Sequence, residues 1–133
     1  MKTMESLLLM AISFVVFPLF FAGAVHAAPK LTEDQKIEAL FTAIQTSNAV
    51  FVRNGEDHPA AEAVVHLRKK LDMAAHSIFA PKRSAWTAKM FIDKIASKSS
   101  LSGEIYLVRL PNKRLCQAGV WLNEQLAIIE SRN

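Results

Sequence analysis

The chain has 133 residues, and its 16 lysines and arginines stand against 12 acidic residues, a formal net charge of +4. A chain of this length forms one domain, and it contains no long Lys/Arg tract or set of base-stacking aromatic residues, so nucleic acid is excluded as the expected partner. The mild positive charge is compatible with anionic partners such as lipid headgroups or acidic glycans. Cys116 is the only cysteine, which excludes an internal disulfide. It is either a small buried residue or the link of a disulfide-bonded dimer.

Residues 1–27 have the pattern of a secretory signal peptide. Lys2 precedes a long, almost wholly apolar run, and small residues suit cleavage after Ala27. A retained membrane anchor is the alternative, because the run approaches the roughly 20 residues that span a bilayer. Pro18 would kink such a span, and no cluster of positive charge follows it. We therefore expect export to the periplasm and a mature domain over residues 28–133 without a stable membrane span.

The first helix of the mature domain is expected to begin at a capping box. Thr32 supplies a hydroxyl for the first free amides, and Gln35 stands three residues later. Apolar residues follow at the three–four spacing of one buried face, as far as Ile44. Short polar side chains at residues 46–48 compete for the backbone and should end this helix.

The next stretch combines a β-prone run, a turn and a second helix start. The run at 49–52 is followed by Arg-Asn-Gly at 53–55, which predicts a turn because Asn and Gly tolerate positive φ. Asp57 is the expected N-cap of the second helix, and Pro59 falls in its first turn. The helix should continue through Ala75. Its expected apolar stripe consists of Ala60, Ala63, Val64, Leu67, Leu71 and Ala74.

The C-terminal half completes a small single α+β domain, mostly helical, with about four helices and one short β-hairpin near the C-terminus. Pro81 forbids helix through the connection that precedes the third helix, which should begin near Ser84 or Thr87. The remaining sequence predicts a strand at 104–110, a turn at 111–113, a return strand at 114–117 and a closing helix at 120–129.

Two motifs carry a family resemblance. Residues 51–71 read F-V-R-N-G-x-x-H-x-x-x-E-A-x-x-H-L-R-x-K-L, and residues 91–109 read F-I-D-K-I-A-S-K-S-S-L-S-G-x-x-Y-L-V-R. Over about residues 31–110 the chain resembles the YfeK-like family of small periplasmic bacterial proteins. The resemblance implies export and a single domain, and it assigns no catalytic residue, since the function of that family is unknown. The matching positions are Arg53, Asn54, Gly55, His58, Glu62, His66, Leu67, Arg68, Lys70, Ser100, Ser102, Gly103 and Tyr106.

His58, Glu62 and His66 follow one another at intervals of four residues. Imidazole and carboxylate suit zinc or copper, but residues eight apart on a regular helix are separated by about 12 Å, too far to hold one ion. No H-E-x-x-H motif is present. We therefore expect no metal or cofactor, and instead a Glu62–His66 pair at the edge of the core. A metal- or His-dependent hydrolase that uses His66 with Glu62 stays open as an alternative.

The loop at 97–103 contains four serines. A serine nucleophile needs a base and an oxyanion hole, and no G-x-S-x-G motif is present, so we interpret the loop as a helix end followed by a turn. Ser102, Gly103 and Tyr106 also form the short S-G-x-x-Y pattern of periplasmic lysozyme inhibitors. This similarity implies an inhibitor rather than an enzyme, and it stays open.

Basic residues from several predicted elements can form one groove if the second helix packs beside the hairpin. Such a groove favours an anionic envelope ligand, whereas solvated charges balanced by nearby carboxylates are the alternative. The residues in question are Arg53, Arg68, Lys70, Lys98 and Arg109.

The absence of a catalytic signature and the unusual polar residues around one helix start together indicate an exported binding or accessory module rather than an enzyme. Its partner is then an anionic envelope ligand or another periplasmic protein. The residues expected at the binding surface are Arg53, Asn54, His58, Glu62, His66 and Ser100.

Overall fold

The computed structural model describes residues 27–133, so the expected signal peptide, apart from Ala27, lies outside the described residues. Within them, no helix is both long enough and apolar enough to cross a bilayer. The chain forms a mostly helical α+β domain, which confirms the predicted fold class. The elements are α1 (Glu33–Thr46), β1 (Val50–Arg53), β2 (Glu56–Pro59), α2 (Ala60–Ala75), η1 (Arg83–Ala85), α3 (Ala88–Phe91), η2 (Ile92–Ala96), β3 (Leu107–Arg109), β4 (Leu115–Gln117) and α4 (Ala118–Ser131).

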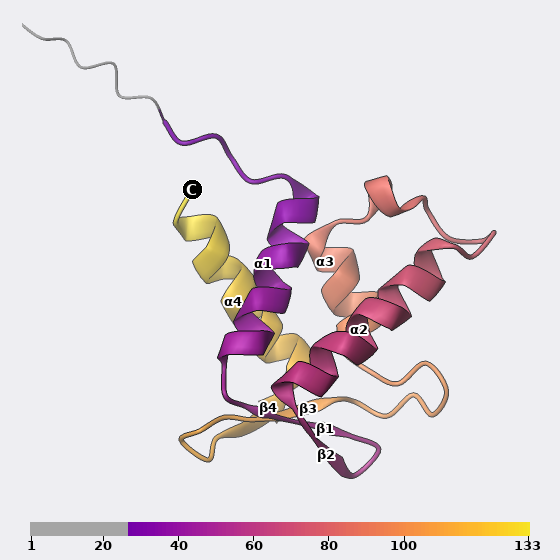
Figure 1. Ribbon diagram of the computed structural model, residues 1–133, viewed down its shortest axis with the longest axis vertical. Coiled ribbons are helices and arrows are strands. Elements are labelled where there is room, and N and C mark those ends of the chain that lie inside the picture. The colour runs from indigo at the N-terminus through magenta and orange to yellow at the C-terminus, as the bar shows by residue number, and fades with distance from the viewer. Residues whose placement is uncertain (1–26) are drawn as a thin grey trace, which may run out of the picture.

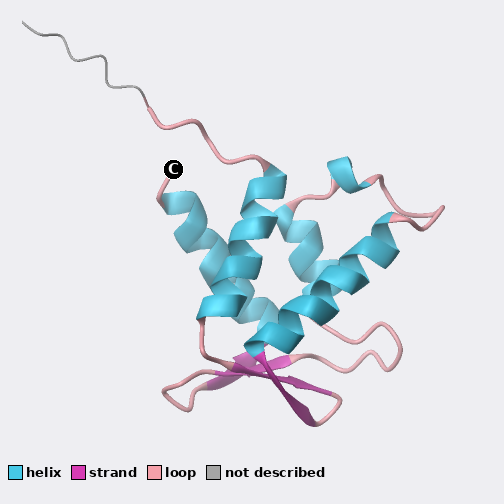
Figure 2. Ribbon diagram, viewed as in Figure 1, coloured by secondary structure: helices cyan, strands magenta, loops and turns pink. Residues whose placement is uncertain are grey.

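The helices lie on one face of a four-stranded antiparallel sheet, as Figure 1 and Figure 2 show. The strand order is β2-β1-β3-β4, and Phe51 of β1 lies opposite His58 of β2 and Val108 of β3. Cross-strand partners share a face of the sheet, and successive residues of a strand alternate between faces. Phe51, Val108, His58 and also Arg53, two residues after Phe51, therefore face the helices.

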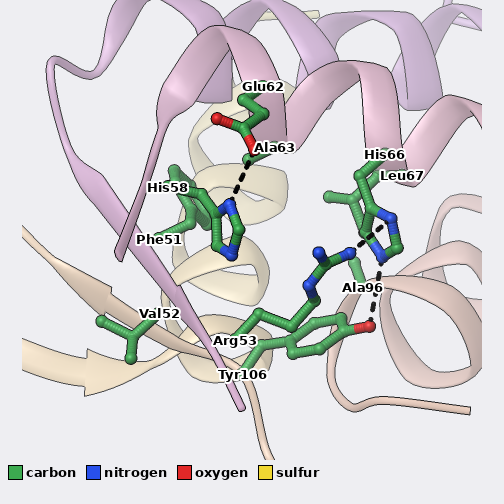
Figure 3. Close-up of a pocket in the computed structure, with 10 residues that line it drawn as sticks. All are labelled: Phe51, Val52, Arg53, His58, Glu62, Ala63, His66, Leu67, Ala96 and Tyr106. Atoms are coloured by element: carbon green, nitrogen blue, oxygen red, sulfur yellow. Dashed lines mark hydrogen bonds and ion pairs between the residues drawn. The ribbon is translucent and has the colours of Figure 1, made fainter. Parts of the chain in front are cut away.

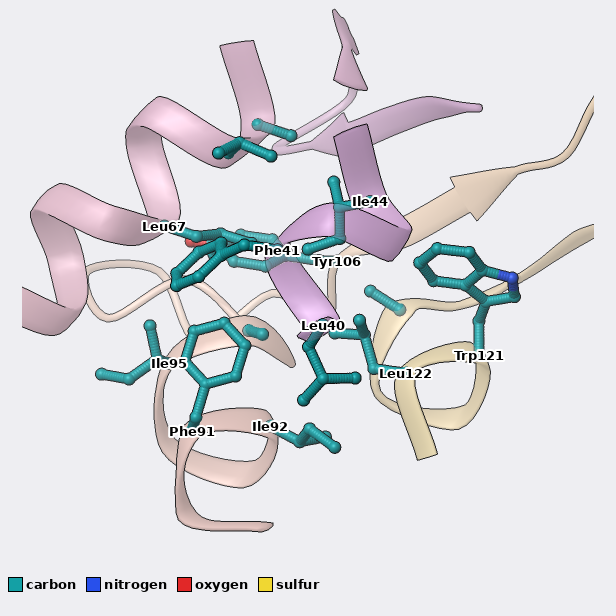
Figure 4. Packing of buried hydrophobic residues seen from close by; sticks show 14 of the residues in the cluster. Leu40, Phe41, Ile44, Leu67, Phe91, Ile92, Ile95, Tyr106, Trp121 and Leu122 are labelled. Carbon is teal, nitrogen blue, oxygen red and sulfur yellow. The ribbon is translucent and has the colours of Figure 1, made fainter. Parts of the chain in front are cut away.

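The core fills the space between the sheet and the helices (Figure 4). Phe41 of α1 packs against Phe91 of α3, with ring centroids 4.9 Å apart, and Phe51 meets the edge of Trp121 at 6.0 Å. Each large apolar side chain buried in this way contributes about 1.5–3 kcal/mol. Further buried residues of this cluster are Leu40, Ile44, Leu67, Ile92, Ile95 and Leu122.

Side-chain caps fix where the helices begin. The predicted capping box is confirmed: Gln35 N donates to Thr32 Oγ1 at 3.2 Å, and Thr32 N donates to Gln35 Oε1 at 2.9 Å. Thr87, one of the two predicted start positions of the third helix, caps α3: its side chain accepts from the backbone N–H of Met90. The Glu33 carboxylate crosses from α1 to accept from the N–H of Ala88 at 2.8 Å, so α1 also holds the start of α3.

The first half of the sheet differs from expectation. The predicted turn is present, with φ of 50° at Asn54 and 78° at Gly55, but it joins two strands and forms an additional hairpin. The prediction that Asp57 caps α2 is wrong, because Asp57 lies in β2 and Pro59 occupies the cap position. A two-residue turn with positive φ at both positions returns the chain along β1, which leaves the residues after it extended rather than helical.

The second half of the sheet and the last helix also differ in extent. The strand expected at 104–110 is regular only in β3, preceded by an isolated bridge between Lys98 and Ile105. The predicted turn at 111–113 and the return strand are confirmed, with φ of 71° at Lys113. Helix α4 begins directly after β4 and is longer than expected at both ends.

Candidate functional site

A small pocket opens where the β1–β2 hairpin meets the first half of α2 (Figure 3). Its volume of about 40 Å³ is enough for about three water molecules, or for one small charged group of a larger ligand. Apolar side chains form the walls, and charged or titratable groups supply the polar atoms. The lining residues are Phe51, Val52, Arg53, His58, Glu62, Ala63, His66, Leu67, Ala96 and Tyr106.

Arg53 and His66 form the central contact of the pocket. The last residue of β1 faces the helices, which brings Arg53 Nη1 to 2.7 Å from His66 Nδ1. Because a guanidinium only donates, Nδ1 must be the acceptor, and neutral His66 therefore carries its proton on Nε2. That nitrogen faces the hydroxyl oxygen of Tyr106 at 3.4 Å, a long contact. The imidazole thus positions Arg53 without neutralising it.

The charge state of His66 follows from its surroundings. Burial lowers the pKa of His66, and the positive charges of Arg53 and Lys70 lower it further. Burial also raises the pKa of Tyr106, so its hydroxyl stays protonated at neutral pH. Arg53 therefore faces two neutral groups, and its positive charge is retained.

Lys70 lies one helical turn beyond His66 and adds a second positive charge. Its Nζ donates to the carbonyl oxygens of Ile95, at 2.7 Å, and Lys98, at 2.5 Å, which closes the end of η2. Burial lowers the pKa of Lys70 to about 8, with further contributions from Arg53 and Lys98. At neutral pH this ammonium is mostly charged, and it lies 5.0 Å from the ring centroid of Tyr106.

His58 faces the pocket from the other strand of the hairpin. Its Nδ1 lies 2.9 Å from Oε1 of Glu62, and its side chain is 14% exposed. Nε2 is buried without a hydrogen-bond partner, although the exposed Glu56 carboxylate lies 3.9 Å away. Since the carboxylate accepts from Nδ1–H, neutral His58 presents a bare lone pair at Nε2, and the imidazolium presents an N–H there.

The two positive charges closest to the pocket form no ion pair within residues 27–133. None of the ion pairs formed among residues 27–133 includes Arg53 or Lys70, even though Glu56 lies opposite Arg53 in the hairpin. Arg53 is therefore a half-buried cation without a carboxylate. The cations that do pair with carboxylates are Lys36, Arg68, Arg83, Lys89, Arg109 and Arg114.

The pocket continues into a wide groove of about 870 Å³, which lies between α2, η2 and two loops. Arg53, His66 and Tyr106 line both hollows. Along the groove the polar lining is basic or neutral, and none of the lining residues is acidic. The other residues that line the groove are Asn54, Lys69, Lys70, Met73, Ala74, Ser77, Phe79, Ala80, Pro81, Trp86, Lys94, Ile95, Ser99, Ser100 and Leu101.

The structure brings the expected surface residues together around Arg53. His58, Glu62 and His66 line the pocket, whereas Asn54 and Ser100 line the groove. Their pairing differs from expectation, however. The expected Glu62–His66 pair does not form, because Glu62 contacts His58 and the ring of His66 is occupied by Arg53.

The basic groove expected from the sequence forms only in part. Arg53 and Lys70 line it, but Arg68 binds the Glu38 carboxylate through both terminal nitrogens, at 2.9 and 2.7 Å, and its guanidinium covers the Phe41 ring. Arg109 pairs with Asp57 on the sheet.

Lys69 and Lys94 line the groove but were not among the expected binding residues, and Tyr106 was expected only as part of the lysozyme-inhibitor pattern. Lys69 is the neighbour on α2 of Lys70, which was expected in the basic groove and shares a helix face with His66. The strand alternation that buries Val108 also buries Tyr106, which is 6% exposed. No local sequence signal predicted that Lys94 lines the groove, since its position depends on how η2 packs against α2.

The structure also bears on the metal site, the lysozyme-inhibitor pattern and the serine loop that the sequence left open. No group of three metal-ligating side chains is gathered anywhere in residues 27–133. In the short S-G-x-x-Y pattern, Ser102 Oγ donates to Asn54 Oδ1 at 2.9 Å, and the Tyr106 ring is buried. A buried tyrosine contacts a second protein only if the loop around it opens. Ser99, the buried serine of the loop, accepts from the N–H groups of Leu101 and Ser102, each at 3.3 Å.

Comparison with known proteins gives one family and one named relative. A family described as "Family of unknown function (DUF5329)" matches residues 31–130. The uncharacterized protein YfeK of Salmonella typhimurium (strain LT2) is 43% identical over 75 residues, which make up 56% of this chain and 57% of that protein. The match thus spans little more than half of the relative's length. No solved structure matches the chain.

Proposed function

The chain belongs to the DUF5329 family of unknown function, and we propose that it is an exported, non-enzymatic module that binds an anionic ligand through Arg53. The similarity to YfeK expected from residues 51–71 and 91–109 is confirmed by that protein's 43% identity. Neither the family nor the relative carries a described function, so the proposal rests on the geometry of the pocket.

The unpaired guanidinium of Arg53 is the observation that carries the proposal. It is held at 2.7 Å by a neutral imidazole, and no ion pair among the described residues neutralises it. A guanidinium binds the oxygens of carboxylates and phosphates with two parallel hydrogen bonds, and such charge-assisted bonds are about twice as strong as neutral ones. The pocket volume of about 40 Å³ suits the anionic group alone, and the groove beside it accommodates the rest of the ligand.

Two further groups complete the proposed anion site. His58 Nε2 has no partner, and in the imidazolium form it becomes a second donor, with Glu62 balancing its charge. The ammonium of Lys70 contributes a positive potential from the groove side.

Export is the second half of the proposal. Lys2, the long apolar run and the small residues up to Ala27 have the order of a signal peptide, and the domain begins shortly after them. Periplasmic location would place the site among anionic envelope components.

A binding measurement tests the anion site. Isothermal titration of sulfate, whose charge does not change near neutral pH, should show binding to the wild-type protein. Arg53→Gln should weaken it by at least about tenfold, since one charge-assisted pair is lost. Lys113→Gln, which removes a cation on the β3–β4 turn, is the matched control and should bind as wild type does. Glu56→Gln should bind equally or more tightly. Equal affinity of wild type and Arg53→Gln, with both folded, would exclude Arg53 as the anion site.

A His-dependent hydrolase is the second candidate, and the His58–Glu62 pair is the observation that favours it. A carboxylate that holds Nδ1–H of an imidazole lining a pocket, with Nε2 free of any hydrogen-bond partner, is the arrangement of a general base. Water would lose a proton to His58 Nε2 as its oxygen attacks an ester carbonyl, and Arg53 would stabilise the oxyanion. Collapse of this intermediate would break the ester C–O bond, and the imidazolium would return the proton to the departing alcohol. The base is then His58, rather than the His66 expected from spacing.

Turnover separates the two candidates. A hydrolase predicts that the protein cleaves p-nitrophenyl acetate or bis-p-nitrophenyl phosphate, and that His58→Gln lowers kcat by at least about a hundredfold. The binding proposal predicts no turnover above that of His58→Gln. Substantial His58-dependent turnover would replace the binding proposal with the enzymatic one.

A further inference from the structure

Three large apolar side chains are almost completely exposed at the tips of two loops. Ile78 is 90%, Phe79 is 93% and Leu101 is 100% exposed, whereas the other exposed large apolar side chains of residues 27–133 range from 43% to 69%. Fully exposed side chains contribute no burial to this fold. Exposed apolar groups that gather on one face mark sites of contact with a protein or a membrane.

Both loops present these side chains through ordered turns. In the first loop, the Phe79 N–H donates to Ser77 Oγ at 3.4 Å, and the Ala80 N–H donates to Ser77 O at 3.1 Å. In the second, Ser99 Oγ accepts from the N–H groups of Leu101 and Ser102, each at 3.3 Å, and Ser99 O accepts from the N–H of Gly103 at 3.0 Å. Figure 1 shows the two loops, after α2 and before β3, projecting from the same side of the molecule.

Basic side chains share the groove with two of these tips. Phe79 and Leu101 line it together with Lys69, Lys94 and Arg53, and none of its lining residues is acidic. None of the ion pairs in the described part of the chain uses these three cations. Apolar tips and uncompensated cations therefore occupy one face.

We propose that this face docks on the surface of a membrane that contains anionic phospholipid. Phe79 and Leu101 enter the boundary between headgroups and acyl chains, while Lys69 and Lys94 contact lipid phosphates. The tips stand on separate turns with a hollow between them. A fluid interface accommodates separated apolar tips, whereas a protein partner would need a matching pair of pockets. The inference goes beyond the anion site and does not depend on Arg53.

Vesicle flotation tests the docking. The protein, purified from cells that express the full chain, should bind vesicles of phosphatidylglycerol and phosphatidylcholine, and bind pure phosphatidylcholine more weakly. Phe79→Ser with Leu101→Ser should lower partitioning by at least about tenfold, because two apolar side chains no longer leave water. Lys69→Gln with Lys94→Gln should lower it by about tenfold or more, because each lysine near an anionic surface contributes roughly fivefold.

Controls of the same type lie on the other parts of the domain. Leu115→Ser removes a half-exposed apolar side chain of β4, and Lys113→Gln removes a cation beside it, so both should bind vesicles as wild type does. An intact mass that begins at Ala28 shows that the apolar leader is not responsible for binding. Because the substituted side chains are exposed, thermal unfolding should be unchanged.

Three results would overturn the docking proposal: no binding to anionic vesicles, equal binding to neutral ones, or undiminished binding by the Phe79/Leu101 double variant. These results leave the anion site testable by itself. A Phe79/Leu101 variant that loses vesicle binding but keeps its sulfate affinity supports both proposals. An Arg53→Gln variant that keeps both activities contradicts only the anion site.

Discussion

At the scale of single residues, the neutral state of His66 decides how the site behaves. Its Nδ1 accepts from Arg53, so a proton on that nitrogen would break the contact and place a third positive charge beside Arg53 and Lys70. Burial and these charges hold the pKa of His66 below its ordinary value of 6.5. The pair therefore persists at pH 6.5 and is lost only as the pH falls through the lowered pKa.

The first prediction concerns this acid sensitivity. As pH falls below 6.5, the unfolded chain protonates His66 before the folded protein does, so stability falls until the pH passes the lowered pKa of the folded state. His66→Asn keeps an acceptor for Arg53 without a titrating group. Urea unfolding between about pH 7.5 and about pH 5 should show a smaller loss of stability for His66→Asn than for wild type. The exposed His76→Asn is the control, and a profile for His66→Asn as steep as wild type's would contradict the assignment.

Lys70 predicts a second pH dependence, on the alkaline side. Its pKa of about 8 means that the ammonium loses its charge as pH rises through that value, while Arg53 stays charged. Sulfate affinity should therefore fall about two- to fivefold between about pH 7 and about pH 9. Lys70→Arg keeps the charge and has donors for the carbonyl oxygens of Ile95 and Lys98, so its affinity should stay constant over this range. An equally steep decline in Lys70→Arg would remove Lys70 from the site.

How far these residues could be predicted depends on what positions them. Spacing along the chain was enough to group Arg53, His58, Glu62 and His66, because they flank one turn and one helix face. Spacing could not predict which of these four side chains contact one another. The hairpin turns His58 toward Glu62 and brings Arg53 to His66, and this follows from cross-strand register, which no local pattern specified.

At the scale of elements, local signals predicted the helices well and the first hairpin poorly. Thr32 and Thr87 have the hydroxyl that a helix start needs, and apolar spacing marked the buried faces of α1 and α2. Strand β2 consists of Glu-Asp-His-Pro, which has no apolar alternation, so it resembles a helix start. Its extended shape is imposed by the positive φ angles at Asn54 and Gly55.

Packing between η2 and α4 supplies a prediction at this scale. A Cβ at Gly119, in the first turn of α4, would lie 2.5 Å from Ser97 Oγ, which itself donates to Ile92 O at 2.6 Å. Gly119→Ala gains up to about 1 kcal/mol of helix propensity. However, the new methyl group forces Ser97 and the start of α4 apart, at a cost of about 1–3 kcal/mol. We expect a net loss of about 1 kcal/mol in the free energy of urea unfolding.

The partner substitution identifies the cause. Ser97→Ala removes the oxygen that the new Cβ would meet, so Gly119→Ala should be less harmful, or stabilising, in a Ser97→Ala background. The coupling between the two changes is measured by the double-mutant cycle. Additive effects would show that the close approach of Gly119 to Ser97 does not limit this position.

At the scale of the whole molecule, our proposal makes residues 1–27 a cleaved leader and residues 28–133 the exported domain. If residues 1–27 direct export, the protein recovered from a periplasmic extract should have an intact mass that begins at Ala28. Ala27→Arg should block cleavage and leave the full-length chain with the membranes, because signal peptidase needs a small residue there. Cytoplasmic recovery of the uncleaved wild-type chain would contradict export.

The histidine side chains of the folded protein provide the most direct test of the anion site. A long-range ¹H–¹⁵N spectrum should show His66 as the neutral Nε2–H tautomer, as its contact with Arg53 requires. Adding sulfate should shift the ring nitrogens of His58 and His66, while the exposed His76 serves as an internal reference. In Arg53→Gln these shifts should disappear. If His58 and His66 respond to sulfate no more than His76 does, or respond equally in Arg53→Gln, the anion site proposed at Arg53 is wrong.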